Sequence, residues 1–188
     1  MRNTRWQVPT LALIAAVGWP VAALPRIRPD PTPTLMTAPD SARVDLGEPT
    51  FSDPTSITNP LFPISELTQV VQVGTEGDVA LRHEITLLPE TKTIDWNGQQ
   101  VETVASQFVA YGDAACLEVA TDFFAQADDG AVWYFGEDVA NYVDGVLDNH
   151  DGTWVAGEDG PPGMIMPGDP QVGDVYRPEN IPASCSRK

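Results

Sequence analysis

Basic residues are nearly absent from most of this chain. Between Phe51 and Tyr176 the sequence holds only Arg82 and Lys92, against 22 aspartates and glutamates, and the formal net charge of the whole chain is -17. Such a surface repels phosphate backbones and anionic lipid head groups, which argues against nucleic-acid binding and against membrane association beyond an N-terminal anchor. It attracts cations and basic partners, although acidity also keeps an exported protein soluble.

The common catalytic and cofactor motifs are missing as well. His83 and His150 are the only histidines, and neither His-Glu-x-x-His nor Cys-x-x-Cys occurs, which argues against a zinc site. Gly-x-Ser-x-Gly, the P-loop and the dinucleotide fingerprint are absent too. We therefore expect no cofactor, apart from the calcium ion considered below, and the lack of a complete catalytic set favours a protein that is not an enzyme.

Cysteine is scarce, with Cys116 and Cys185 as the only two. In an exported chain an even count allows one disulfide, which would tie the C-terminal tail to the body of the domain. The alternative is a buried thiol at Cys116 and a free, exposed thiol at Cys185.

The N-terminus has the features of an export signal. Two arginines precede an apolar run from Val8 to Leu24, and small residues at Val21-Ala22-Ala23 offer a cleavage point. We expect residues 1–23 to be a signal peptide of a periplasmic or extracellular protein. Positive charge at Arg26 and Arg28 opposes export of the run, so an uncleaved N-terminal membrane anchor remains the alternative.

The rest of the chain divides by composition. Residues 24–58 are rich in proline, threonine and aspartate, which predicts a flexible, extended spacer. Residues 59–182 should form a β-rich domain, and Phe51 is the alternative start of the folded body. Asn59-Pro60-Leu61-Phe62-Pro63-Ile64 would form an entry turn that docks apolar side chains. Residues 183–188 would be a loose tail.

Short runs of β-branched and aromatic residues alternate with Gly, Asp and Asn turns through the domain. Asn97-Gly98 is a strong signal for a two-residue hairpin turn. Regular turns between short strands predict an all-β, mostly antiparallel meander that forms a curved sheet or partly closed barrel. A helix over 102–111 is the main alternative. The expected strands are Glu66–Val73, Asp78–Leu88 (closed by Pro89), Thr91–Trp96, Val101–Tyr111, Cys116–Gln126, Ala131–Tyr142 and Thr153–Ala156, with a further edge strand over Gly173–Tyr176.

One stretch, from Asp122-Phe123-Phe124-Ala125-Gln126 to Gly130-Ala131-Val132-Trp133-Tyr134-Phe135-Gly136-Glu137-Asp138, resembles a motif of an uncharacterised exported bacterial family. That family has Trp-Tyr where this chain has Phe123-Phe124. The resemblance implies export and a β-rich domain, and it implies no activity. Four further segments are similar to the same family: Asn59–Pro63, Gly152–Gly157, Pro162–Pro167 and Val172–Arg177.

A group of carboxylates and aromatic residues is the first candidate site. Because alternate residues of a strand share a face, Glu118, Asp122 and Gln126 should lie on one side of their strand. Trp133, Phe135 and Glu137 should share a face of the next strand, opposite Val132 and Tyr134. Convergence of these faces would make a polar pocket walled by aromatic rings, with Glu118, Asp122, Gln126, Trp133 and Glu137 as ligand-binding residues. The plainer interpretation is the wet side of a sheet.

A second candidate is an oxygen cage for calcium. With Gly152 aligned to the glycine of a calcium loop, Asn149, Asp151 and Glu158 fall at ligand positions. Leu147 occupies the first ligand position and cannot coordinate, so the segment is not an EF-hand. An ordinary Asp-Gly turn explains the same residues.

These observations favour an exported acidic β-domain that binds a small ligand or a protein partner without catalysis. Two alternatives remain. One is a hydrolase that uses Asp122 with Glu118 or Glu137 as a carboxylate pair. The other is a calcium-stabilised envelope or surface module.

Overall fold

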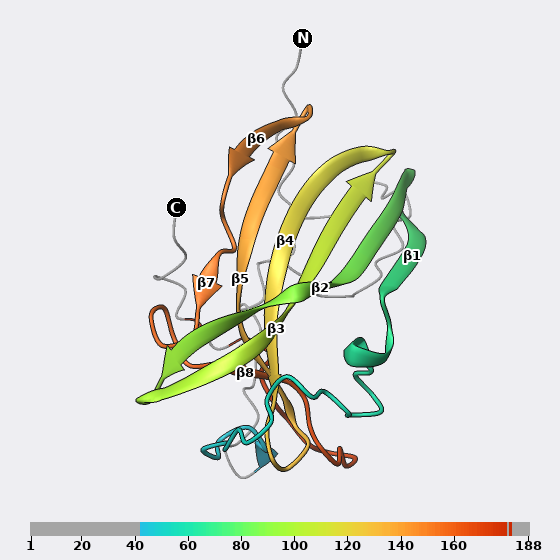
Figure 1. Cartoon of the computed structure of the whole chain (residues 1–188). Coiled ribbons are helices and arrows are strands. Elements are labelled where there is room, and N and C mark those ends of the chain that lie inside the picture. The colour runs from blue at the N-terminus through green and yellow to red at the C-terminus, as the bar shows by residue number, and fades with distance from the viewer. Residues whose placement is uncertain (1–41, 180, 182–188) are drawn as a thin grey trace, which may run out of the picture.

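Antiparallel strands joined by tight turns make up almost the whole fold. The computed structural model describes residues 42–179 and 181, which form one sheet curled into a half-barrel (Figure 1). The predicted all-β meander is therefore confirmed, and the helical alternative over 102–111 is wrong. The strands are β1 (Gln69–Glu76), β2 (Val79–Trp96), β3 (Gln99–Gly112), β4 (Ala115–Gln126), β5 (Val132–Val143), β6 (Val146–Asn149), β7 (Trp154–Val155) and β8 (Gly163–Met166), and a 3-10 turn at Ile64–Glu66 precedes β1.

The sheet order follows the sequence from β1 to β6. Strand β5 then pairs along the rest of its outer edge with β7 and β8, so three short strands follow one another beside it. Asn97 and Gly98 have φ angles of 49° and 76°, as a two-residue turn between β2 and β3 requires. The hairpin predicted from this dipeptide is therefore confirmed.

Several predicted strand boundaries are wrong, and β1, for example, covers Gln69–Glu76 instead of Glu66–Val73. Strand β2 runs straight through Pro89, and the proline falls where the pairing with β3 shifts between Leu87 and Thr91. An irregularity of this kind accommodates a residue that has no N–H to donate. The expected edge strand over 173–176 is reduced to an isolated parallel bridge between Val175 and Arg43.

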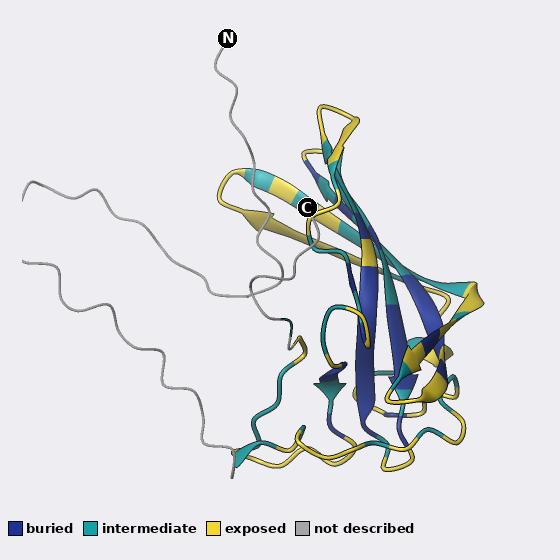
Figure 2. Cartoon of the chain, turned by 90° about the vertical axis from the view of Figure 1, so that its left-hand side faces the viewer, coloured by how far each residue is buried: buried dark blue, intermediate teal, exposed yellow. Residues whose placement is uncertain are grey.

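The buried residues are concentrated in β3, β4 and β5 (Figure 2). Residues 50–58, which composition assigned to the spacer, pack against this core. Ile57 is 1% exposed, and the ring of Phe51 lies 5.4 Å from that of Phe135 in an edge-to-face contact. Asp128 accepts hydrogen bonds from the hydroxyl of Thr50 and the backbone N–H of Ser52. The folded unit therefore includes part of the segment before Asn59.

The predicted entry turn at Asn59 is confirmed. The side-chain nitrogen of Asn59, Nδ2, donates to the carbonyl oxygens of Gly130 and Pro167, and its side-chain oxygen accepts from Leu61 N–H. The ring of Phe62 packs 5.1 Å from that of Phe124. One asparagine thus joins the start of the domain to two loops that lie far away in the sequence.

A β-bulge interrupts β5 at Phe135. Phe123 pairs with Gly136 and Phe124 pairs with Tyr134, so Phe135 has no partner on β4. Gly136 has a φ of 128°, in a region that L side chains rarely adopt. The extra residue reverses the alternation of β5, and side chains three positions apart, such as those of Tyr134 and Glu137, come to lie on the same face.

The leader (1–23), most of the spacer, Cys185 and the tail lie outside the described residues, so neither the signal peptide nor the Cys116–Cys185 pairing is tested. Within the part of the chain that the structure describes, no helix has the length and apolar character needed to cross a membrane.

Substitution of Gly136 by alanine should destabilise the fold. A Cβ there would clash with the carbonyl oxygen of Trp154 and lie 2.9 Å from the Cα of Val155, both backbone atoms of β7. Because the positive φ adds to this clash, we expect the free energy of unfolding to fall by at least about 3 kcal/mol, as measured by urea denaturation.

The matched control is Gly74→Ala in β1, where a Cβ would meet nothing within 4 Å. It should change the free energy of unfolding by no more than about 0.5 kcal/mol. Equal losses for the two variants would show that the bulge does not require glycine.

Candidate functional site

Three of the predicted ligand-binding residues share one face of the sheet. Asp122 of β4 lies directly opposite Glu137 of β5, and Glu118 lies four residues earlier on β4, opposite Asn141. Opposed residues on antiparallel strands have Cβ atoms about 5 Å apart, so the carboxyl groups of Asp122 and Glu137 are close neighbours. We call this side of the sheet the carboxylate face.

Two aromatic residues complete this group. Tyr134 donates a hydrogen bond from its hydroxyl to Asp122 Oδ1 at 2.7 Å. Trp154 of β7 lies opposite Glu137, and its ring meets that of Tyr134 edge to face at 5.3 Å. Simple alternation along β5 missed Tyr134. The only hint in the sequence is Gly136, since a glycine inside a strand often marks a bulge.

The other two predicted ligand-binding residues make different contacts: Gln126 keeps the side of β4 predicted for it, whereas Trp133 does not share a face with Glu137. Trp133 pairs with Ala125 and is 4% exposed on the opposite face, so the predicted shared face of Trp133, Phe135 and Glu137 is wrong. The bulge is the reason. Gln126 accepts hydrogen bonds from the backbone N–H groups of Thr58 and Asn59, so its side chain fastens the N-terminal segment.

Burial raises the pKa values of the facing carboxyl groups. Desolvation raises the pKa of Asp122 to about 6, although the Tyr134 hydrogen bond acts in the opposite direction. Desolvation and the charge of Asp122 raise the pKa of Glu137 to about 8. The pKa values of Glu118 and Glu179 are also raised by desolvation. At neutral pH the facing pair therefore holds one ionised and one protonated carboxyl group.

Glu179 reaches this group from the C-terminal segment. Gly163 of β8 has no side chain, and the carbonyl oxygen of Pro178 occupies the space that a Cβ would need. The backbone N–H of Met164 donates to the carbonyl oxygen of Arg177 at 2.8 Å. These contacts hold the chain beside β8 and leave Glu179 at the solvent-exposed rim, where its charge raises the pKa values of Asp122 and Glu137.

Three buried polar side-chain atoms of the described residues have no hydrogen-bond partner; one of them, Trp133 Nε1, lies on the opposite face, and the other two are on the carboxylate face. Ser106 of β3 is opposite Asp122 and is 0% exposed, yet its Oγ is unpaired. The Nε1 of Trp154 is unpaired as well, in a side chain that is 3% exposed. Since a buried unpaired polar group costs about 1–3 kcal/mol, both groups are suited to bind something that the protein itself does not supply.

Asn149, one of the residues predicted to bind calcium, uses its side chain in a local turn. Asn149 Oδ1 accepts hydrogen bonds from the side chain of Asn141 and from the N–H of Asp151, which describes an Asx turn. Among the described residues no group of three or more His, Cys, Asp and Glu side chains is placed to hold a metal ion. Cys116 is half-buried near the other end of β4, and burial raises the pKa of its thiol.

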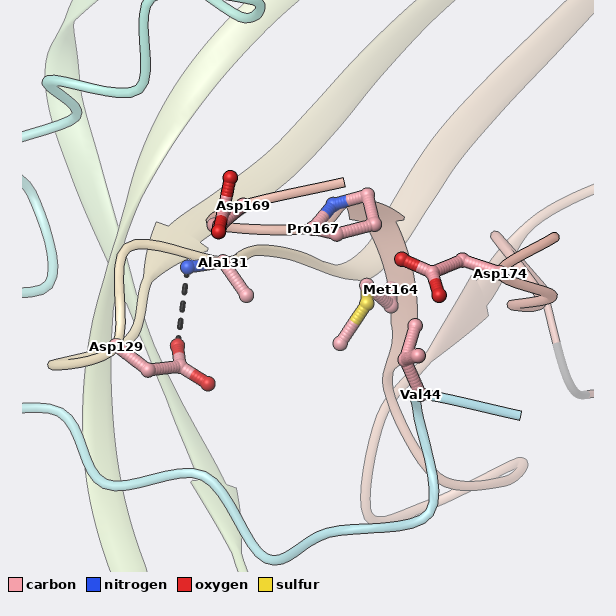
Figure 3. A pocket seen from close by; sticks show the side chains of 8 residues that line it. Val44, Asp129, Ala131, Met164, Pro167, Asp169 and Asp174 are labelled. Atoms are coloured by element: carbon pink, nitrogen blue, oxygen red, sulfur yellow. Dashed lines mark hydrogen bonds between the residues drawn. The ribbon is translucent and has the colours of Figure 1, made fainter. Parts of the chain in front are cut away.

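A hollow of about 260 Å³ lies away from the carboxylate face (Figure 3). Its wall includes three aspartates, but Asp129 accepts from Ala131 N–H and Asp174 accepts from Gln171 N–H. Figure 3 shows these carboxylates pointing in different directions. We therefore place the candidate site on the carboxylate face.

Comparisons with protein-family models, with curated proteins and with solved structures found no match to this chain. The candidate site is therefore defined by its own geometry alone.

Two buried hydroxyl groups on β3 provide a test of the unpaired serine. Thr103, like Ser106, is 0% exposed, but its Oγ1 donates to the carbonyl oxygen of Lys92 at 2.8 Å. Thr103→Val should lower the free energy of unfolding by about 1–2 kcal/mol, whereas Ser106→Ala should leave it unchanged or raise it by up to about 1 kcal/mol. Urea denaturation measures both, and a loss for Ser106→Ala equal to that for Thr103→Val would mean that the serine is satisfied in the fold.

The free energy of unfolding should fall as the pH rises through the titration of Asp122 and Glu137. The folded-state pKa values of Asp122 and Glu137 are raised to about 6 and about 8, so the folded state binds more protons than the unfolded chain between about pH 4 and 8. The protein should therefore be more stable at pH 5 than at pH 8, by a few kcal/mol at roughly 1.4 kcal/mol per pKa unit. Urea denaturation at the two pH values measures this difference.

Glu137→Gln should reduce that pH dependence and stabilise the protein at pH 8. Asp138→Asn is the control, because Asp138 is an exposed neighbour that pairs with Lys92 on the opposite face. A Glu137→Gln variant with the same pH profile as the unmodified protein would contradict the assignment.

Proposed function

We propose that this protein is a non-enzymatic binding domain whose carboxylate face takes up a small ligand. The observation that carries the proposal is the pair of unpaired buried groups, Ser106 Oγ and Trp154 Nε1, set opposite Asp122 and Glu137. Binding sites commonly combine aromatic walls with a few converging polar groups, and such a combination is found here.

The rigid position of the polar groups on packed strands supports the proposal. The polar groups stand on β3, β4, β5 and β7, whose packing fixes them before any ligand arrives. Rigid elements hold a binding group more accurately than loops do, and less ordering entropy is lost on binding. A solvated sheet face would instead carry exposed polar side chains, whereas Glu137 is only 8% exposed.

We propose that the domain works outside the cytoplasm, in the periplasm or the extracellular space. This proposal rests on the two arginines and the apolar run of the N-terminus, and on the resemblance to an exported family. Whether the run is cleaved or kept as an anchor is decided by the mass of the mature protein.

A carboxylate-pair hydrolase is the second candidate. The specific observation in its favour is the split protonation of Asp122 and Glu137, because an ionised and a protonated carboxyl group can act as nucleophile or base and as general acid. Against it, no described histidine or cation lowers either pKa. If the pair is catalytic, Asp122→Asn and Glu137→Gln should each abolish turnover of a chromogenic glycoside while leaving the fold intact.

The binding proposal is tested by NMR with a panel of glucose, glycerol, choline, 4-amino-1-butanol and benzoate. A ligand should shift the amide signals of Ser106, Asp122 and Glu137 and raise the melting temperature, since binding to the folded state alone stabilises it. Asp129→Asn, in the hollow, should bind as the unmodified protein does. Shifts confined to the hollow, or none on the carboxylate face with any compound, would contradict the proposal.

A further inference from the structure

The charge of the carboxylate face is unbalanced. Asp122, Glu137 and Glu118 face the same way, and Glu179 lies at the rim. The arginine and the lysine of the strands are on the other side, whereas His83 of β2 lies on the carboxylate face, in register with Ala110 and Glu118. Arg82 lies over the ring of Tyr111, and Lys92 lies 4.0 Å from the ring of Phe123 and pairs with Asp138. The described strands therefore supply no lysine or arginine to neutralise the buried carboxyl groups.

Burying carboxyl groups without a counter-charge is costly, and it forces them to hold protons. Among the described residues no basic group lowers the pKa of Asp122 or Glu137. A positively charged ligand would provide the missing counter-charge. The rings of Tyr134 and Trp154 stand beside the carboxyl pair, and aromatic faces also attract cations.

The unpaired groups narrow the chemistry of such a ligand. An indole N–H can only donate, so Trp154 Nε1 needs an acceptor atom on the ligand. The hydroxyl of Ser106 can accept a hydrogen bond from an ammonium group. A bare metal ion cannot accept the hydrogen bond that Trp154 Nε1 offers, and no described cluster of three metal-ligating side chains surrounds the site. The ligand should therefore carry both an N–H donor and a lone pair.

We propose that the carboxylate face binds a small organic ammonium ion that carries a hydroxyl group, which is the chemistry of an amino alcohol. The ammonium group lies over Asp122, between Ser106 and Glu137, and donates to Ser106 Oγ, while the hydroxyl oxygen accepts from Trp154 Nε1. This inference rests on the proposed binding function and adds the class of ligand to it.

Probes with the same four-carbon chain and different charges test the ligand class directly. Calorimetry compares 4-amino-1-butanol, 1,4-butanediol and 4-hydroxybutyrate, which share a hydroxyl and differ in charge. We expect the cation to bind at least tenfold more tightly than the neutral diol and the anion to bind least. Butylammonium, which lacks the hydroxyl, should bind several-fold more weakly than 4-amino-1-butanol.

Binding should also release protons, because the ammonium ion favours the charged forms of Asp122 and Glu137. The groups that face this pair are Glu118 from β4, Tyr134 from β5, Trp154 from β7, Ser106 from β3 and Glu179 from the C-terminal segment, and none of them is a base. Affinity for 4-amino-1-butanol should therefore rise at least threefold from pH 5.5 to pH 8.5. Calorimetry in two buffers of different ionisation enthalpy measures the protons released.

Variants of the two carboxyl groups test the ligand class separately from the proposed binding function. Asp122→Asn and Glu137→Gln should each lower the affinity for 4-amino-1-butanol at least tenfold, and Asp138→Asn should leave this affinity unchanged within twofold. Circular dichroism confirms that the variants are folded. If the neutral diol or calcium chloride binds on this face as tightly as the cation, the ligand class is wrong and the binding function stands. If no probe of any charge binds there, both proposals fail.

Discussion

The β-bulge at Phe135 is the feature on which the arrangement of the site depends. It removes Phe135 from the pairing between β4 and β5 and requires a positive φ at Gly136. Without it, Tyr134 and Glu137 would face opposite sides of the sheet, because alternate residues share a face. With it, the hydroxyl of Tyr134 reaches Asp122 while Glu137 still lies opposite that same aspartate. The bulge also lets β7 approach, since Gly136 leaves room for the backbone at Trp154.

Packing and polar chemistry are divided between the two sides of β5. The displaced Phe135 is fully buried and meets the rings of Phe51 and Trp96, which anchors the segment before the first strand. On the carboxylate face the same strand supplies Tyr134 and Glu137. The aromatic contacts of the core stabilise the position of β5, and this stability compensates the cost of desolvating the carboxyl groups. Strain and buried charge kept within a well-packed fold are typical of functional sites.

Much of the fold follows from local patterns in the sequence. Regular turn residues predicted the meander, and Asn97-Gly98 located a hairpin that the structure confirms. The errors arose where tertiary contacts outweigh local signals. Pro89 was expected to end a strand, but the pairing of β2 with β3 continues beyond it. Residues 50–58 were expected to be a spacer, but burial of Ile57 and hydrogen bonds to Asp128 fix them against the sheet.

The sequence by itself determined the strand-and-turn order, the acidic surface and the presence of Glu118, Asp122 and Glu137 on adjacent strands, because composition and period-two alternation are local properties. Only the tertiary structure decided that Tyr134, Trp154 and Ser106 join these carboxyl groups and that Trp133 does not. Cross-strand register and one inserted residue control that choice, and register is set by pairing between distant segments. The degree of burial, which raises the pKa values of the carboxyl groups, is likewise a property of the assembled sheet.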